Sequence, residues 1–229
     1  MLSNLDICVI INIYNKHKFK VISDSLVLAK GNIYISGDNV LYNQSKSDFY
    51  FALSDGMGSG LRAYEASKDM LMRVDSLINL KISDELLLNN LKHMYNYSCV
   101  YDSYGTLDLL HINKSNFKCN LYKVASSVTL LIRNEQIYEY ITDTLPLGSG
   151  DIITKYDIDL QYYDLILLLS DGITDQVDKK SLYKYIKSIC REKTEKISSL
   201  LSEFVYHKSG GKLKDDLSVI AIKILPLIN

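Results

Sequence analysis

Four aspartates of this chain stand beside glycine or another acid, at points where an apolar run gives way to a turn. They lie in the segments Ser36-Gly37-Asp38, Ser54-Asp55-Gly56, Ser170-Asp171-Gly172 and Lys214-Asp215-Asp216. A carboxylate at a strand end projects just beyond the sheet, and glycine lets a ligand or metal approach the backbone. Carboxylates that converge repel one another unless cations lie between them. The pattern therefore predicts an oxygen-ligand metal site of the kind that suits magnesium or manganese.

The elements that must position these carboxylates follow from the hydrophobic pattern. Short apolar, β-branched runs between turn residues predict strands at 7–14, 19–28, 33–35, 49–53, 106–112, 118–124, 128–133, 136–141, 152–156, 163–169 and 217–225. Apolar residues at three- and four-residue spacing predict helices at 61–80, 83–97, 179–190 and 194–207. Asp38-Asn39 is expected to be a turn.

The order of these elements is strands, two helices, strands, two helices and a final strand. A doubly wound parallel sheet would alternate strands and helices singly, so the expected fold is α+β, with mostly antiparallel sheet and helices on its faces. In this scheme Asp38, Asp55 and Asp171 follow strands, whereas Asp215 precedes one. Because a strand end and its antiparallel neighbour's beginning lie at the same edge, all four are expected to meet at one rim.

Composition limits the classes of protein that remain. The 229 residues are 47% hydrophobic, which is enough for a large core, and we expect one domain over residues 1–229. The formal net charge is -1 and the charges are mixed, which favours neither nucleic acid nor an anionic membrane as a partner. No run approaches the ~20 apolar residues that a membrane-spanning helix needs.

The cysteines and the N-terminus indicate the compartment. Cys8, Cys99, Cys119 and Cys190 are widely scattered and form no CxxC pair. This spacing argues against zinc and against a disulfide framework, and it fits reduced thiols. The N-terminal segment has no basic region before its short apolar stretch, so no signal peptide is predicted. A cytoplasmic protein is expected.

Several segments, taken in order, resemble the metal-dependent protein phosphatase (PPM) family, and within it the phosphatase domain of stage II sporulation protein E. The resemblance runs from about residue 30 to residue 224. Besides the four aspartate segments, it is carried by Ala29-Lys30-Gly31, Gly56-Met57-Gly58-Ser59-Gly60, Thr106-Leu107-Asp108-Leu109, Lys123-Val124-Ala125-Ser126, Leu145-Pro146-Leu147-Gly148, Gly210-Gly211 and Leu217-Ser218-Val219-Ile220. Segment 125–128 stands where that relative has a turn richer in glycine and proline.

The resemblance implies two packed antiparallel sheets flanked by helices, and a centre of two manganese or magnesium ions. Such a centre hydrolyses phosphoserine or phosphothreonine with metal-activated water. On the matching positions, Asp55 would bridge both ions. Asp38 and the Gly56 carbonyl would hold one ion, and Asp171 and Asp215 the other. Asp216 is expected to cap the turn and is left outside the ligand set.

The resemblance also implies partners. The substrate would be a phosphorylated anti-sigma factor antagonist, whose dephosphorylation frees a sigma factor in sporulation. The helix at 61–80 resembles the element that switches the sporulation phosphatase on, and a homodimer is expected through the helices at 61–80 and 83–97. Two alternatives stay open: a general stress-response phosphatase of the same fold, and a non-catalytic module that binds the phosphoregulator.

Some of these residues also have purely structural explanations. A single Asp-Gly is ordinarily a turn. The glycine-rich loop at 56–60 suggests a phosphate cradle, but it lacks the Lys-Ser/Thr ending of a P-loop, so a tight turn that offers the Gly56 carbonyl is favoured. The histidines have no acidic or cysteine partner at ligand spacing and are expected to be surface or packing residues. They are His17, His93, His111 and His207.

Overall fold

The computed structural model describes residues 10–14, 19–31, 35–97 and 104–227, which form two β-sheets. In spatial order, sheet A contains β1 (Ile10–Tyr14), β2 (Phe19–Leu28), β11 (Leu217–Pro226), β10 (Leu165–Leu169), β7 (Thr129–Arg133) and β8 (Gln136–Tyr140). Sheet B contains β3 (Asp38–Gln44), β4 (Asp48–Asp55), β5 (Leu107–Asn113), β6 (Lys118–Val124) and β9 (Thr154–Asp159). Every pairing between these strands is antiparallel.

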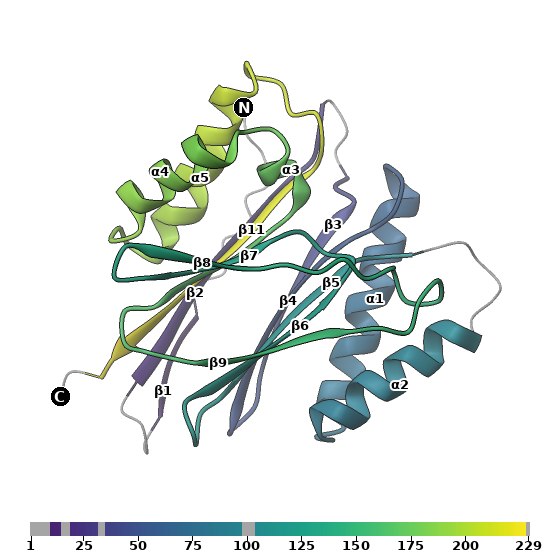
Figure 1. Cartoon of the computed structure of the whole chain (residues 1–229). Helices are drawn as coiled ribbons and strands as arrows, with labels where there is room; N and C mark the ends of the chain where they lie inside the picture. The colour runs from purple at the N-terminus through teal and green to yellow at the C-terminus, as the bar shows by residue number, and fades with distance from the viewer. Residues whose placement is uncertain (1–9, 15–18, 32–34, 98–103, 228–229) are drawn as a thin grey trace.

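Helices cover the outer face of each sheet, so that the molecule has four layers (Figure 1). On sheet B lie α1 (Leu61–Asn79) and α2 (Asp84–Tyr97). On sheet A lie α3 (Asp171–Thr174), α4 (Lys179–Ile189) and α5 (Thr194–Lys208). The predicted α+β fold of two packed antiparallel sheets flanked by helices is therefore confirmed. Within the described ranges, no helix is both long and apolar enough to cross a membrane.

The core follows the same layering. Between the sheets, side chains such as Phe51 of β4 and Ile166 of β10 are buried against each other's layer, at 1% and 0% exposure. Because helices cover its other face, β10 is buried on both sides and reads as a continuous apolar run in the sequence. Each of the two outer faces has its own apolar cluster under the helices.

The strand β3 was not predicted from the sequence. Asp38-Asn39 is not a turn: Asp38 is the first residue of β3, and it therefore precedes a strand instead of following one. The strand is at the edge of sheet B and most of its residues are only half-buried, so it lacks the apolar run that marks its neighbours. The strand expected at 33–35 lies mostly outside the described residues, as does the first part of the one expected at 7–14.

Candidate metal centre

Sheet B supplies two of the four aspartates. Asp38 begins β3 and Asp55 ends β4, and the two are direct partners in the antiparallel register. Asp55 is held by Thr106: its backbone N–H donates to Thr106 Oγ1 over 2.9 Å, and its carbonyl accepts from the Thr106 N–H over 2.8 Å. The two residues therefore lie at the same end of sheet B, although Asp38 begins its strand and does not follow one as expected.

Gly56 follows Asp55 at a point where the backbone meets the first turn of α1. A Cβ atom on Gly56 would lie 1.8 Å from the carbonyl oxygen of Ala63, so no other residue fits without moving the helix. The Gly56 N–H donates to the carbonyl of Gly37 over 3.2 Å, which ties the end of β4 to the segment before β3. This close contact with α1 is sufficient to explain why position 56 is glycine. It also leaves the backbone of Gly56 beside Asp38 and Asp55.

Sheet A supplies the other two aspartates, from its neighbouring strands β10 and β11. Asp171 comes two residues after β10 and is the first residue of α3. Asp215 lies two residues before β11, which pairs with β10. A Cβ atom on Gly172 would lie 1.9 Å from the Asp216 carbonyl oxygen, so only glycine allows α3 to begin this close to β11. The four aspartates were expected at the rim of one sheet, but each of the two sheets supplies two of them.

Asp216 has a different environment from Asp215. Its carboxylate accepts the backbone N–H of Lys30 over 2.7 Å and that of Gly37 over 2.6 Å, and the residue is only 6% exposed. These two bonds fix the connection that leads from β2 in sheet A to β3 in sheet B. Each of its two carboxylate oxygens thus accepts one backbone N–H, and its omission from the expected ligand set stays a prediction.

Electrostatics indicate where a cation is needed. Asp38 is 3% exposed, and neither of its carboxylate oxygens has a hydrogen-bond partner among the described residues. Burial and the neighbouring Asp55 raise the pKa of Asp38 to about 8, which the nearby hydroxyls of Ser170 and Ser218 only partly offset. Burial and Asp171 raise the pKa of Asp55 to about 7. The carboxylates of the two sheets thus repel one another across the gap.

The pKa of Asp171 is also raised, by burial and then by Asp215. Asp215 itself pairs with Lys30, whose ammonium lies 2.7 Å from Oδ1. This hydrogen bond is the main reason that the pKa of Lys30 is raised. The charged side chain of Lys30 thus binds to the acidic rim through Asp215.

The residues fit a hard divalent cation. The side-chain donors at the rim are all carboxylate oxygens, and the orphaned carboxylate of Asp38 requires a positive partner in order to ionise. Within the described ranges, no three acidic, histidine or cysteine side chains converge on one point to form a closed cage. A magnesium ion held by one or two carboxylates ordinarily keeps several waters, so it does not need such a cage.

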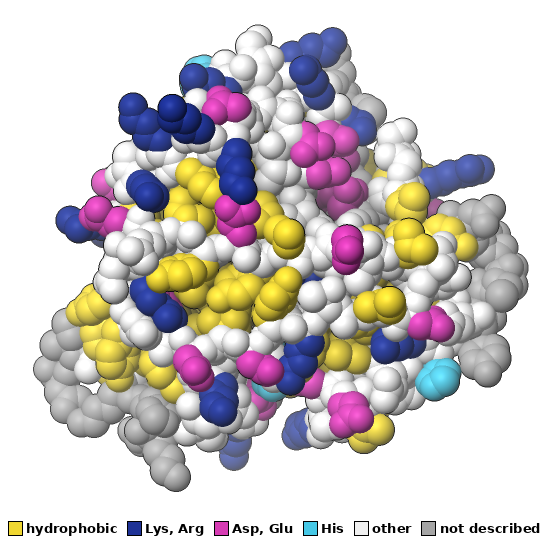
Figure 2. Space-filling view, viewed as in Figure 1, with side chains coloured by type: hydrophobic (Ala, Val, Ile, Leu, Met, Phe, Trp, Pro, Cys, Tyr) yellow, Lys and Arg dark blue, Asp and Glu magenta, His cyan; other side chains and the backbone are white. Residues whose placement is uncertain are grey.

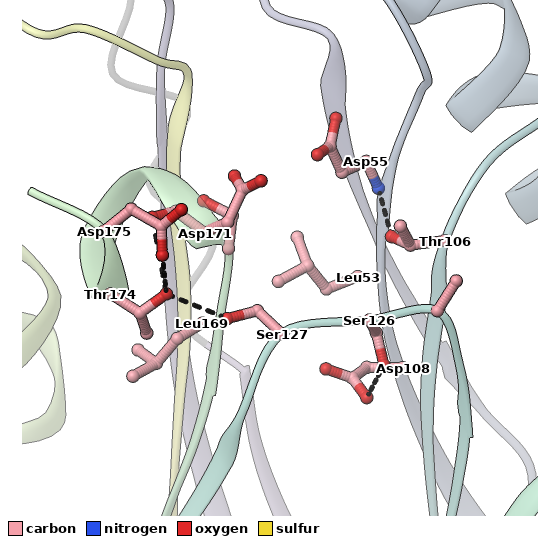
Figure 3. Close-up of a pocket in the computed structure, with 12 residues that line it drawn as sticks. Leu53, Asp55, Thr106, Asp108, Ser126, Ser127, Leu169, Asp171, Thr174 and Asp175 are labelled. Atoms are coloured by element: carbon pink, nitrogen blue, oxygen red, sulfur yellow. Dashed lines mark hydrogen bonds between the residues drawn. The ribbon is translucent and has the colours of Figure 1, made fainter. Parts of the chain in front are cut away.

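A cavity of about 260 Å³ lies between the two halves of the rim. Figure 3 shows Asp55, Thr106 and Asp108 on one side, Asp171, Thr174 and Asp175 on the other, and segment 125–128 crossing between them. In Figure 2, acidic side chains gather over this end of the molecule, near α3. A small, charged group could reach the aspartates from here.

Several residues of this cavity were not expected to be site residues, although some of them lie in segments that carry the family resemblance. They are Thr106, Asp108, Ser126, Ser127 and Thr174, together with Lys123 behind them. The available signal was an aspartate and a lysine within two predicted strands, because a charge that is buried in a strand needs a partner. Their pairing could not be read from the sequence, since it depends on the register of β5 and β6.

Known proteins share this sequence pattern and this architecture. The family model described as Stage II sporulation protein E (SpoIIE) matches residues 45–225. Stage II sporulation protein E of Bacillus subtilis (strain 168) is 26% identical over 217 residues, which cover 90% of this chain and 26% of that protein. The chain therefore corresponds to well under half the length of this relative.

Solved structures agree in fold. The PP2C phosphatase domain of SpoIIE from Bacillus subtilis, with a fragment of its regulatory domain, matches with a TM-score of 0.82 and 22% identity, over 98% of this chain and 72% of that one. RsbX in complex with magnesium matches with a TM-score of 0.70 and 17% identity, over 95% of this chain and all (100%) of that one.

Two packed antiparallel sheets with helices on both outer faces are thus the architecture of a PP2C-type serine/threonine phosphatase domain. The expected resemblance to metal-dependent protein phosphatases is confirmed. More narrowly, the chain belongs to the stage II sporulation protein E (SpoIIE) family.

Proposed function

We propose that this chain, as one phosphatase domain, hydrolyses phosphoserine or phosphothreonine in a protein with the help of two manganese or magnesium ions. The observation that carries the proposal is the buried Asp38 carboxylate, which has no hydrogen-bond partner among the described residues and lies beside Asp55 at a rim that Asp171 and Asp215 complete. Four acids in this arrangement have a use only if cations join them. RsbX, which matches in fold, is in complex with magnesium.

The proposed roles divide between the two sheets. Asp55 would contribute to holding both ions, Asp38 and the Gly56 carbonyl would hold one, and Asp171 and Asp215 would hold the other. When bound, two such ions lower the pKa of a coordinated water and neutralise the charge of the phosphoryl oxygens.

The protein's own contribution is position. Thr106 holds the backbone of Asp55 from both its N–H and its carbonyl side, and Asp216 holds the connection before Asp38. Lys30, at the same rim, is free to exchange Asp215 for a phosphate oxygen, because its ion pair is partly exposed.

The first prediction tests this assignment. Asp55→Asn and Asp171→Asn are each expected to lower the manganese-dependent turnover of a phosphomonoester by about 100-fold or more, because each removes a charged ligand. The measurement is hydrolysis of para-nitrophenyl phosphate, with circular dichroism to check the fold. Asp157→Asn, on the exposed edge strand β9, is the matched control and should leave turnover unchanged.

Two results would contradict the assignment. Wild-type turnover in both variants would exclude the two-ion mechanism. If the wild-type protein bound no manganese at millimolar concentrations in calorimetry, the non-catalytic, phosphoregulator-binding function would replace it.

We further propose that the substrate is a phosphorylated anti-sigma factor antagonist and that the protein acts in the cytoplasm, in the regulation of a sigma factor. Membership of the SpoIIE family supports the sporulation role, whereas fold similarity to a structure described under the bacterial stressosome keeps a stress-response role open. Asp171→Asn can serve as a substrate trap. The phosphoprotein that co-purifies with it, identified by mass spectrometry, distinguishes the two roles.

A further inference from the structure

Three connections carry the chain from one sheet to the other at the end that holds the proposed metal centre, and the third leads from β8 to β9. The first, from β2 to β3, is the one held by Asp216. The second is segment 125–128, which leads from β6 in sheet B to β7 in sheet A. It forms one wall of the cavity next to the aspartates (Figure 3). A change in the path of this segment would alter how the two halves of the rim face each other.

Segment 125–128 is attached to a buried ion pair. Asp108 of β5 and Lys123 of β6 are register partners, and their side chains are 1% and 0% exposed. Both lie on the strand face that also carries Leu110 and Leu121 into the space between the sheets. An ion pair at such a position loses its hydration, so it needs further hydrogen bonds to persist.

Those further bonds all lead to the segment or to its immediate neighbour. The Lys123 ammonium donates to Asp108, to the carbonyl of Ser127 over 2.6 Å and to Thr129 Oγ1 over 3.0 Å. Since an ammonium has three N–H bonds, each has an acceptor. Asp108 also accepts the hydroxyl of Ser126 over 2.8 Å. The pair therefore fixes both the backbone and a side chain of segment 125–128.

The segment in turn contacts the other half of the rim. Ser127 Oγ lies 3.1 Å from Thr174 Oγ1, within hydrogen-bond distance. Thr174 is the last residue of α3, whose first residue is Asp171, and its hydroxyl donates to the Asp171 carbonyl over 3.4 Å. A continuous set of contacts thus runs from the buried pair in sheet B to the helix that presents Asp171.

We propose that Asp108 and Lys123 are positioning residues: through segment 125–128 and Thr174 they set the separation between Asp55 on sheet B and Asp171 on sheet A. A pair of well-packed apolar residues would stabilise the fold at least as well, so the ion pair is better explained by the geometry it imposes than by stability. The consequence for metal binding rests on the function proposed above. The positioning itself is a property of the metal-free protein.

The test replaces the pair as a whole. The double variant Lys123→Met/Asp108→Leu leaves no unpaired charge in the core, and its midpoint of urea unfolding should therefore equal or exceed that of the wild type. In hydrogen exchange of the metal-free protein, amides of residues 125–128 and 171–175 should exchange about tenfold faster. In calorimetry, manganese should bind about tenfold more weakly.

The matched control is a second ion pair of the same sheet interface. Arg133 and Asp164 form a bidentate pair at 2.8 and 2.7 Å, at the opposite end of β7 and β10 from the metal centre. Arg133→Met/Asp164→Leu removes a comparable pair without touching segment 125–128. Exchange at residues 171–175 and manganese affinity should stay at wild-type values.

Thr174→Val provides a second test that does not disturb the core. It removes the contact to Ser127 while the buried pair remains, and it should weaken manganese binding about threefold with an unchanged unfolding midpoint. Wild-type exchange and wild-type manganese affinity in the double variant would overturn the proposal. If instead the wild-type protein binds no manganese but the exchange difference persists, the positioning holds and the proposed metal-dependent function fails.

Discussion

At the scale of single residues, the proposed metal centre contains a buried carboxylate that destabilises the metal-free fold when it is charged. Asp38 is buried beside Asp55, with no hydrogen-bond partner for its carboxylate among the described residues. A buried, unpaired charge is among the most destabilising features that a fold can contain, and it is usually relieved by protonation. A bound cation would also relieve this destabilisation, and the carboxylate would then stay ionised.

The pH dependence of stability follows from this. The folded-state pKa values of Asp38, about 8, and Asp55, about 7, lie above the unfolded value, so the metal-free native state binds more protons than the unfolded state. The free energy of unfolding of the metal-free protein should therefore fall by several kcal/mol as the pH rises from about 4 to about 8, and both groups contribute to this loss. Urea titrations in EDTA measure it. Asp38→Asn should make the slope shallower while Asp55 keeps its own contribution, and a profile that rises with pH would contradict the assignment.

At the scale of elements, helix α2 is attached to sheet B by a histidine. His111 of β5 lies between two carboxylates: Nε2 is 2.9 Å from Asp48 of β4, and Nδ1 is 2.8 Å from Asp84, the first residue of α2. Asp84 also accepts the hydroxyl of Tyr122, over 2.6 Å. His111 is a packing residue, as expected, and it has no acidic partner at ligand spacing in the sequence because both of its partners are close only in the fold.

This attachment predicts a second pH effect. Although burial opposes its charged form, Asp48 and Asp84 raise the pKa of His111 to about 9. The stabilisation is therefore fully present below the unfolded pKa of about 6.5 and is lost as the pH rises through about 9. Relative to His111→Gln, the wild type should lose roughly 2 kcal/mol of unfolding free energy over this interval. Urea titrations of both proteins with manganese present check it, and parallel profiles would exclude the ion pairs.

At the scale of the whole molecule, the two sheets form one core, and the metal centre depends on their packing. Phe51 is buried between the sheets in β4, the strand that ends at Asp55. Phe51→Ala should lower the free energy of unfolding by roughly 3–5 kcal/mol, because it leaves a cavity between the layers. Ile141→Ala, at a residue that is 62% exposed, should change it by less than about 0.5 kcal/mol. Urea unfolding of both variants measures this, and equal losses would contradict a shared inter-sheet core.

Association of two copies through α1 and α2 stays a prediction. Sedimentation velocity over a range of protein concentrations would test it.

Much of the fold was predictable where local pattern and burial coincide. β4, β6, β10 and β11 are apolar because they are buried, and α1 and α4 show the spacing of a helix with one buried face. The turn at Asn134-Glu135 was readable as well, since both residues adopt positive φ values of 50° and 63°, as a tight hairpin requires. The edge strand β3 was not, because edge strands need few apolar residues.

The sequence by itself determined the four aspartates, the glycines that let their backbones approach neighbouring elements, and the antiparallel order of the strands that carry them. These are local properties, set by residue type and by periods of two and 3.6 residues. Only the tertiary structure decided that the rim is divided between two sheets, that Asp216 holds a connection, and that Lys123 pairs with Asp108 behind the cavity. Such contacts join residues far apart in the chain, and they depend on strand register and sheet packing, which no local pattern encodes.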